Sequence, residues 1–590
     1  DSSAVNTSTG EYIYMAFKDT RTNAYYLDQS GNANNFAATG LEYKDSRPDS
    51  PTNNSATFNA LVKDLRYATA LSDGNKTITF TSGSSGFSGC PMTIFRNEGK
   101  AYCEVNLDVT YSGDSTDSQC VFVVDDGQDF SAIGSGSQNS ALVGSYCGGG
   151  SGSAPAEISS NGSDQGGSPS KYRTQNDRVG VYIDFDGDGT NGKGFFALNG
   201  TVQTVNGTPD IANGTNPHFT FTANSRLTVG VGGIHAGTPA VLTLKDDSSD
   251  WETTPPSGYT SFSTANLQDP AIDPNKGDDP KEYFNTVLYI GDGSSNRGIT
   301  GVGFSPDFLW IKDRVATNNH ILVDKVRGVA KLLFSNSNIA EISGATQIAS
   351  LDADGFTLGT STTYVNENGS SNAYVAWNWK AGGSTQTTNT DGTITSLVSV
   401  SAESGFSVVA YTGTGSAGTV GHGLGKAPAW IIIKNRGTGN REWLIYHHES
   451  EGVPQNFGMF FTNADPFDDD SAFNDTAPTT DVFSVKNSTS SNNTSEEYIA
   501  YCFAEIEGYS RFGRFAAVGG ADNSFIYLGF RPAWFLIKRV NADGYDWVLY
   551  DNTRDPFNVG STRVSPNLSN AEVTGASNYG IDFVSNGVKL

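Results

Sequence analysis

The sequence contains few of the residues that cross-link small secreted proteins or bind metal ions. It has five cysteines and six histidines among 590 residues. Five cysteines are too few for a disulfide scaffold. Cys502 stands alone on an apolar run, where we expect it to be a small buried hydrophobe. The other four allow pairing in an oxidising compartment, and the sequence leaves their redox state open: Cys90, Cys103, Cys120 and Cys147.

Charged residues are also scarce, at 17% of the chain, and acidic ones prevail, giving a net charge of −26. No apolar run approaches the roughly 18 residues that a membrane-spanning helix needs. An acidic surface repels phosphate backbones and anionic lipids. We therefore expect no nucleic-acid partner and no membrane insertion.

Turn-forming and aromatic residues are plentiful instead. Glycine accounts for 68 residues and aromatic residues for 11% of the chain. This composition is typical of an all-β, turn-rich extracellular protein with enough aromatic side chains to fill several cores. At this length the chain exceeds what one hydrophobic core organises, so several domains are expected.

One stretch occurs three times and organises the second half of the chain. Each copy places a glycine and a proline before a short apolar run that contains tryptophan and ends on lysine, which predicts a turn followed by a buried strand. The copies span residues 303–312, 423–434 and 529–538. Each is followed by a second strand (321–324, 443–446, 547–550) and a third (355–358, 482–485, 587–590).

A closing strand completes the first two copies, at 372–379 and 497–503, but the third copy has none. Residues 11–17 carry the same apolar alternation as the two closing strands. Three arrangements would explain this: the strand completes the third repeat in the same molecule, it completes that repeat in a neighbouring copy by strand addition, or residues 1–19 finish a further repeat that is absent here.

The spacing between copies is far above solenoid periods, so we expect each repeat to be a small β-sandwich of its own. A stretch rich in proline, aspartate and serine precedes the repeats and reads as a linker. The expected organisation is a closing strand segment (1–19), a sandwich domain (20–250), the linker (251–282) and β repeats 1 (283–383), 2 (384–515) and 3 (516–590, lacking its own closing strand).

The sandwich domain resembles a known family. Residues 179–186, followed by 194–200, look like the central strand pair of SPRY domains, and Glu104 is similarly placed to the glutamate of that family's "WYFEV" strand, although the tryptophan is missing. The resemblance implies a concanavalin-like jelly roll. Residues 20–50 read as turns, and the Gly/Ser-rich stretch 148–170 reads as a mobile surface insertion.

The repeats resemble strings that occur together in virion and tail-fibre-like proteins of tailed bacteriophages, on residues 498–513, 529–534 and 12–17 with 49–54. This resemblance implies a non-enzymatic, extracellular role at a virion surface, in a fibre that contacts the host. It implies as partners a homo-oligomer or other virion proteins, and a host surface glycan or protein. It carries no catalytic residues.

Asp184, Asp186 and Asp188 form the sharpest chemical pattern. Carboxylates at alternate positions before a glycine can surround calcium, although Phe195 stands where the bidentate glutamate of such loops belongs. A hairpin turn between two strands explains the same residues. Calcium is the one cofactor that the sequence suggests.

His447 and His448 are the one histidine pair, and neighbours on a strand point to opposite faces, so we expect surface polarity rather than a metal site. Two other functions stay open. One is a bacterial extracellular filament assembled head-to-tail by strand addition. The other is a glycan-degrading enzyme of the tailspike type, which needs two carboxylates about 5 to 10 Å apart.

Overall fold

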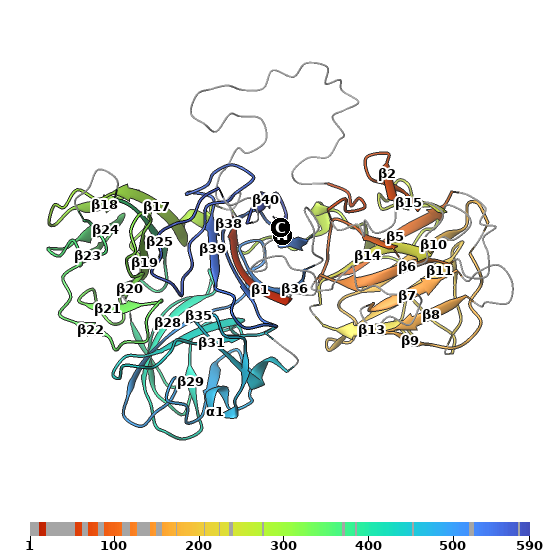
Figure 1. Ribbon diagram of the computed structural model, residues 1–590. Helices are drawn as coiled ribbons and strands as arrows, with labels where there is room; N and C mark the ends of the chain where they lie inside the picture. The colour runs from red at the N-terminus through yellow and green to blue at the C-terminus, as the bar shows by residue number, and fades with distance from the viewer. Residues whose placement is uncertain are drawn as a thin grey trace, which may run out of the picture. The chain divides into compact units, whose positions relative to one another are not determined.

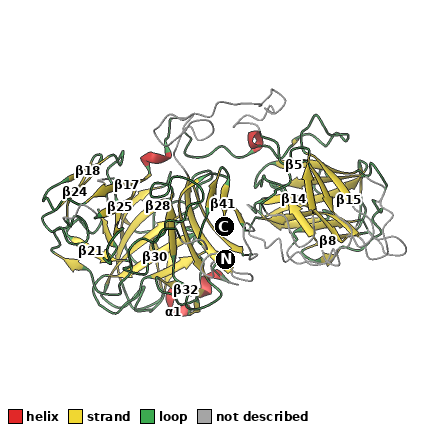
Figure 2. Ribbon diagram, turned by 45° about the horizontal axis from the view of Figure 1, so that its top comes forward, coloured by secondary structure: helices red, strands yellow, loops and turns green. Residues whose placement is uncertain are grey.

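The computed structural model describes residues 11–18, 54–61, 69–80, 88–108, 118–126, 142–148, 156–172, 174–205, 207–223, 225–234, 240–273, 277–367, 372–383, 386–450, 453–517, 524–575 and 579–590. The chain divides into two compact units, which we call the sandwich unit (residues 23–268 and 522–525) and the repeat unit (residues 1–22, 269–521 and 526–590). Both are built of strands, with helices no longer than four residues in the described ranges (Figures 1 and 2). None of those helices has the length and hydropathy needed to cross a bilayer.

The sandwich unit consists of two sheets. Cys103, Val181 and Phe196 from the first sheet share one apolar core with Val121 and Val229 from the second. The first sheet has the order β12 (Thr201–Val202), β11 (Asn191–Leu198), β10 (Arg178–Asp184), β5 (Lys100–Leu107), β15 (Ala240–Lys245), β3 (Thr77–Phe80), β2 (Thr69–Ser72), with β13 (Phe219–Thr222) beside β11 and β16 (Tyr259–Thr260) beside β5. The second has the order β4 (Ser88–Pro91), β14 (Leu227–Ile234), β6 (Ser118–Asp125), β7 (Gly144–Cys147), β8 (Glu157–Ser160), β9 (Ser163–Asp164).

The strand pair that carries the SPRY resemblance lies at the centre of the first sheet. Strands β10 and β11 pair antiparallel, and β5 flanks β10 on its other side. Glu104 on β5 is fully buried. Its carboxylate accepts a 2.7 Å hydrogen bond from the Tyr102 hydroxyl and lies 3.3 Å from Nε of Arg178, so the buried charge is compensated.

The predicted linker 251–282 is wrong over its first part. Trp251 packs edge-on against Tyr102 at 4.9 Å between ring centroids, and Tyr259 packs against Tyr182 at 5.5 Å. These contacts cover the outer face of the first sheet, and the stretch also contains the 3₁₀ helix η3 (Thr264–Asn266). Turn-rich composition misled the prediction, because a few aromatic anchors suffice to bind such a segment to a sheet.

The predicted mobile insertion at 148–170 is also wrong where the structure describes it. Strands β8 and β9 form a hairpin that extends the second sheet beyond β7, and Ile158 is fully buried in the core. Serine and glycine dominate this stretch, but the buried isoleucine and the backbone hydrogen bonds fix it to the second sheet. Residues 149–155, and the turns predicted for 20–50, lie outside the described residues.

The repeat unit contains three modules, each with a large sheet and a small sheet. In module 1 the large sheet is β17 (Phe284–Ile290), β25 (Ala373–Trp379), β19 (Phe308–Asp313), β20 (Ile321–Asp324), β21 (Lys331–Phe334), β22 (Ile342–Ser343), and the small one β18 (Gly298–Thr300), β24 (Gly355–Leu358), β23 (Ile348–Asp352). In module 2 they are β26 (Thr387–Asn389), β27 (Ser396–Ser401), β28 (Phe406–Thr412), β35 (Glu497–Phe503), β30 (Trp430–Asn435), β31 (Leu444–His447), β32 (Phe457–Phe460), β33 (Phe467–Asp468), and β29 (Gly418–Gly421), β34 (Val482–Val485). In module 3 they are β36 (Ser510–Ala516), β1 (Glu11–Lys18), β38 (Pro532–Arg539), β39 (Val548–Asp551), and β37 (Phe525–Tyr527), β41 (Gly587–Lys589), β40 (Asp582–Val584). The helices are α1 (Asp470–Phe473) and the 3₁₀ turns η5 (Pro280–Glu282) and η6 (Pro454–Asn456).

The N-terminal strand β1 completes module 3 in the same chain, which is the first of the three arrangements considered above. It lies between β36 and β38 and pairs antiparallel with both (red beside blue in Figure 1). Its register also matches: Ile13 pairs with Lys538, as Val375 pairs with Lys312 and Ile499 with Lys434. Since β36 pairs with β1, module 3 begins near residue 510, so the predicted boundary between repeats at 515/516 is wrong.

Each module is a small β-sandwich of two sheets, as the sequence predicts, and the three sandwiches also pack against one another. Each has a core of its own between its two sheets, but the outer faces of the three large sheets meet in a shared core. The first-repeat strand Phe308–Asp313 is buried along its whole length, because one face packs within its module and the other in the shared core. The tryptophans of the shared core are Trp310, Trp377, Trp379, Trp430, Trp443, Trp534 and Trp547.

Candidate functional site

Buried polar side chains connect the modules at two of the three interfaces. At both, the contacts centre on a short motif of an aspartate followed three residues later by an arginine. In module 1 Asp324 ends strand β20, and the guanidinium of Arg327 lies 2.5 Å from its carboxylate; both side chains are fully buried. In module 3 Asp551 and Arg554 repeat this geometry, with the same 2.5 Å contact. In both, the aspartate also accepts a 2.8 Å hydrogen bond from the backbone N–H of the arginine, which fixes the turn after the strand.

Each of these aspartates accepts a hydrogen bond from the closing strand of the neighbouring module. The Tyr501 hydroxyl of module 2 donates to Asp324 at 2.8 Å, and Nε1 of Trp377 in module 1 donates to Asp551 at 3.0 Å. Trp377 on β25 and Tyr501 on β35 occupy the same register position. Each stands two residues after the residue that pairs with the lysine of the repeated motif. The equivalent position on β1 is Met15.

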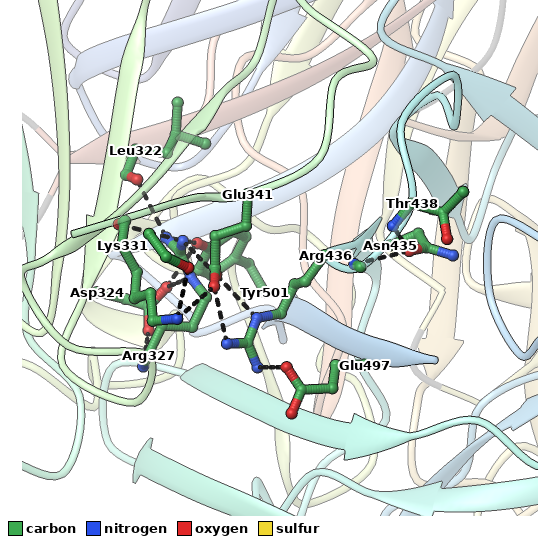
Figure 3. A network of polar contacts seen from close by, with 12 residues as sticks. Leu322, Asp324, Arg327, Lys331, Glu341, Asn435, Arg436, Thr438, Glu497 and Tyr501 are labelled. Carbon is green, nitrogen blue, oxygen red and sulfur yellow. Dashed lines mark hydrogen bonds and ion pairs between the residues drawn. The ribbon is translucent and has the colours of Figure 1, made fainter. Parts of the chain in front are cut away.

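A glutamate extends each motif across its interface, and Figure 3 shows the one between modules 1 and 2. Glu341 lies 3.2 Å from Arg327 of its own module and 2.9 Å from Arg436 of module 2, which in turn approaches Glu497 at 3.5 Å. Burial opposes ionisation of Glu341, but the hydrogen bond from Arg436 and the charge of Arg327 outweigh it and lower the pKa of this carboxyl. The module 3 to module 1 interface has the equivalent contacts of Glu572, at 3.1 Å from Arg554 and 2.8 Å from Arg314.

At the third interface, between modules 2 and 3, other residues stand at the positions of these aspartate, arginine and hydrogen-bond donor side chains. His447 stands where the other modules have aspartate, Ser450 where they have arginine, and Met15 where they have Tyr501 or Trp377. His447 is fully buried, so the expectation of surface polarity is wrong for it, and burial holds its pKa well below the usual value. His448 contacts the backbone carbonyl of Phe512 in module 3 through Nε2, at 2.9 Å. Aligning the second strands of the repeats would have revealed this position.

A buried lysine is the penultimate residue of one large-sheet strand in every module, β19, β30 and β38. Lys312, Lys434 and Lys538 are at most 1% exposed, and each ammonium donates to backbone carbonyls of the loop that leads to the next strand. Burial lowers the pKa of each lysine from 10.5 to about 8. The lysine that the sequence motif contains is therefore a structural anchor of the loop.

We expect these lysines to make stability rise with pH between about 8 and 9.5. Over that window the unfolded chain binds more protons than the folded one, so the free energy of unfolding increases, by at most about 1.4 kcal/mol per pH unit for each lysine. Lys434→Met should remove the share of one lysine from this slope, at most about 1.4 kcal/mol per pH unit. Chemical denaturation at several pH values measures it.

Other titrating groups contribute to the pH dependence of stability with the opposite sign. Comparing the slope of the variant with that of the parent cancels them. Burial raises the pKa of the Cys103 and Cys502 thiols, so these residues lower stability as the pH rises above their unfolded values. They affect parent and variant equally. Lys426→Met, at an exposed lysine, is the control and should leave the slope unchanged. A Lys434→Met slope equal to that of the parent would refute the assignment.

The structure does not bring the three carboxylates of the calcium hypothesis together. Asp184 is buried and pairs with Lys100 at 3.0 Å, whereas Asp186 accepts from the backbone N–H of Gly99 at 3.0 Å. Asp188 is exposed and accepts from the backbone N–H groups of Thr190 and Asn191. No group of three potential metal ligands gathers anywhere in the described ranges. The geometry is that of the hairpin turn between β10 and β11, the other interpretation of these residues.

Among the cysteines, Cys120 and Cys147 lie opposite each other on β6 and β7 and form a disulfide. Cys90 and Cys103 are free and buried. Cys502 is fully buried on β35, as expected for a small hydrophobe.

A pocket of about 300 Å³ opens in module 3. Its polar lining comes from two loops and a strand end that lie up to 34 residues apart in the sequence, which is why no local motif predicts it. The lining side chains that could bind a ligand are Tyr545, Asp546, Arg563, Ser565, Asn570 and Tyr579.

Comparison with known proteins gives matches to solved structures and to one family model. Solved structures similar to it include the SPRY domain of human HERC1 (15% identity over 32% of this chain and 98% of that one, TM-score 0.23), the PSpry domain of TRIM65 (13%, 32% and 92%, 0.20) and the carbohydrate-binding module CBM66 from Bacillus subtilis (9%, 33% and 93%, 0.19). The search among curated proteins found no match. Residues 279–590, more than half of the chain and nearly all of the three modules, match the family model described as a domain of unknown function, DUF7483. The chain is a member of the DUF7483 family.

Proposed function

We propose that this chain is a non-enzymatic structural and adhesive protein outside the cell, and that it forms part of a surface appendage, a fibre, of a tailed phage virion. The virion setting rests on the strings that the repeats share with such proteins. Its partners are further copies of itself or other virion proteins. The ligand it contacts is a glycan or protein on the host surface.

One observation supports the structural part of this proposal above all: a single chain builds a closed ring of three modules. Phe308 of module 1 stacks on Tyr501 of module 2 at 4.2 Å, and Trp430 of module 2 packs on Trp547 of module 3 at 5.7 Å. Trp377 of module 1 donates to Asp551 of module 3. A ring with a common apolar core and sealed interfaces is a rigid support, on which surface loops hold binding groups in fixed positions.

The buried acidic residues of the ring fit this role better than a catalytic one. Asp324, Asp551, Glu341 and Glu572 each have arginine partners across or beside an interface. A glycosidase would instead keep a pair of carboxylates free to reach a bound sugar. The filament alternative would require β1 to leave its place between β36 and β38 and enter another copy.

Immuno-electron microscopy of phage particles with an antibody against the chain tests the proposal. We expect label on a tail or capsid appendage, and we expect the antibody to block adsorption to host cells. Label along a continuous cellular filament would support the filament alternative. Release of reducing ends from host polysaccharide by the purified chain would support the enzyme alternative, and either result would overturn the proposal.

A further inference from the structure

The pocket in module 3 has the size and lining of a small-ligand site. Its volume of about 300 Å³ is at the lower end of the range for such sites, enough for one ring-sized ligand. Two tyrosines, Tyr545 and Tyr579, contribute aromatic surface, while Val548 and Val573 contribute apolar walls. A few polar groups among aromatic and apolar walls are what fix the orientation of a bound small molecule.

Arg563 is the residue that suggests the ligand's charge. Its guanidinium lies over the Tyr579 ring at 3.4 Å from the centroid, and its backbone exchanges two 3.0 Å hydrogen bonds with Val573. The ring contact positions the guanidinium, and the backbone hydrogen bonds fix the main chain from which the side chain extends. Yet its Nη1 is shielded from solvent and has no hydrogen-bond partner among the residues described.

A shielded guanidinium nitrogen without an acceptor is costly, because it has lost water and gained no replacement. An anionic oxygen placed in the pocket would supply that acceptor, and the planar guanidinium is suited to carboxylate. One carboxylate also lines the pocket: Asp546 accepts a 2.6 Å hydrogen bond from the side-chain amide of Asn567. Ser565 and Asn570 add hydroxyl and amide groups, which can bind hydroxyls of a ligand.

We propose that this pocket binds a carboxylate-bearing sugar residue of the uronate type, with its carboxylate on Arg563 and its hydroxyls on the surrounding polar groups. A single ring matches the volume, and a carboxylate matches the unused donor. That the sugar belongs to a host surface glycan rests on the proposed function; the chemistry of the pocket does not.

Calorimetric titration of the full chain with glucuronate tests this proposal, with glucose, acetate and inorganic phosphate as comparison ligands. We expect glucuronate to bind at least tenfold more tightly than each of the other three. Equal affinity for glucose would show that the carboxylate is not recognised, and tighter phosphate binding would show a general anion site. Either outcome, or no glucuronate binding at millimolar concentration, overturns the proposal.

Arg563→Gln should weaken glucuronate binding at least tenfold and leave glucose binding unchanged. The matched control is Arg539→Gln: this arginine also lies over a tyrosine, Tyr545 at 4.5 Å, but it is not part of the pocket lining. It should keep the parent affinity. Equal melting temperatures of both variants and the parent establish that folding is intact. If Arg563→Gln proves unstable, Ala571→Trp serves as the test instead, because it fills the pocket from another wall and should abolish binding.

The test separates this inference from the proposed function. If glucuronate fails to bind while the antibody still labels virions and blocks adsorption, the ligand assignment is wrong and the adhesive role stands. If glucuronate binds but no label appears on particles, the pocket is real and the virion assignment is wrong.

Discussion

Deletion of residues 1–18 should unfold module 3, lowering the free energy of unfolding by more than about 5 kcal/mol. The deletion removes the strand between β36 and β38 and leaves the backbone groups of both neighbours unpaired. It also removes Tyr14 and Met15, both buried, which contribute to the module 3 core and the shared core respectively. Thermal and denaturant unfolding of the full chain and of the deletion variant measure the loss.

Two controls make this result specific. Deletion of residues 1–9 alone removes chain that precedes β1 and should leave the transition unchanged. A synthetic peptide of residues 10–19, added to the larger deletion variant, should restore the transition, because strand addition returns the missing ladder. Met15→Ala in the full chain should cost about 2 to 5 kcal/mol. Identical melting of parent and 1–18 deletion would show that module 3 is complete without β1.

The second large effect concerns the ion pair at the interface between modules 3 and 1. Arg554→Met should destabilise the chain by about 3 to 5 kcal/mol, because it leaves the buried Asp551 carboxylate without its arginine. The Glu572 carboxylate loses a 3.1 Å partner in the same change. Denaturant unfolding monitored by tryptophan fluorescence suits this test, since Trp377 donates to Asp551.

Module 2 supplies the matched double variant. Asp551→His with Arg554→Ser reproduces the natural His447 and Ser450 of the equivalent position and buries no unpaired charge. It should be clearly more stable than Arg554→Met alone. Lys486→Met, at an exposed pair with Asp470, should change stability by less than about 1 kcal/mol. Equal losses in the Lys486 and Arg554 variants would show that burial of the pair does not matter.

Much of the repeat unit could be predicted from sequence because its signals are local and recur. Glycine, proline, tryptophan and lysine mark the first strand of each module, and the alternation in residues 11–17 identified the strand that completes the third. The interface motif could not be found in this way. Asp324 and Tyr501 lie 177 residues apart, and nothing in either neighbourhood indicates that they meet.

The errors have physical causes of the same kind. Composition assigned residues 251–282 to a linker, yet Trp251 and Tyr259 bind its first part to a sheet face. Calcium binding by the alternating aspartates stays a prediction, although Asp184 pairs with a lysine on the neighbouring strand. His447 was expected at the surface because histidines are polar, whereas its position on β31 directs its side chain into the interface between modules 2 and 3. In each case a distant residue decided the outcome.

The position of β1 has a consequence for how the molecule is made. The strand leaves the ribosome about 500 residues ahead of β36 and β38, the partners it must join. At roughly 5 to 20 residues per second, about 25 to 100 seconds pass before its partner strands are made. Translation that stops before β38 therefore yields a chain in which β1 lacks its two partner strands, so the ring of modules cannot close before β36 and β38 have been made.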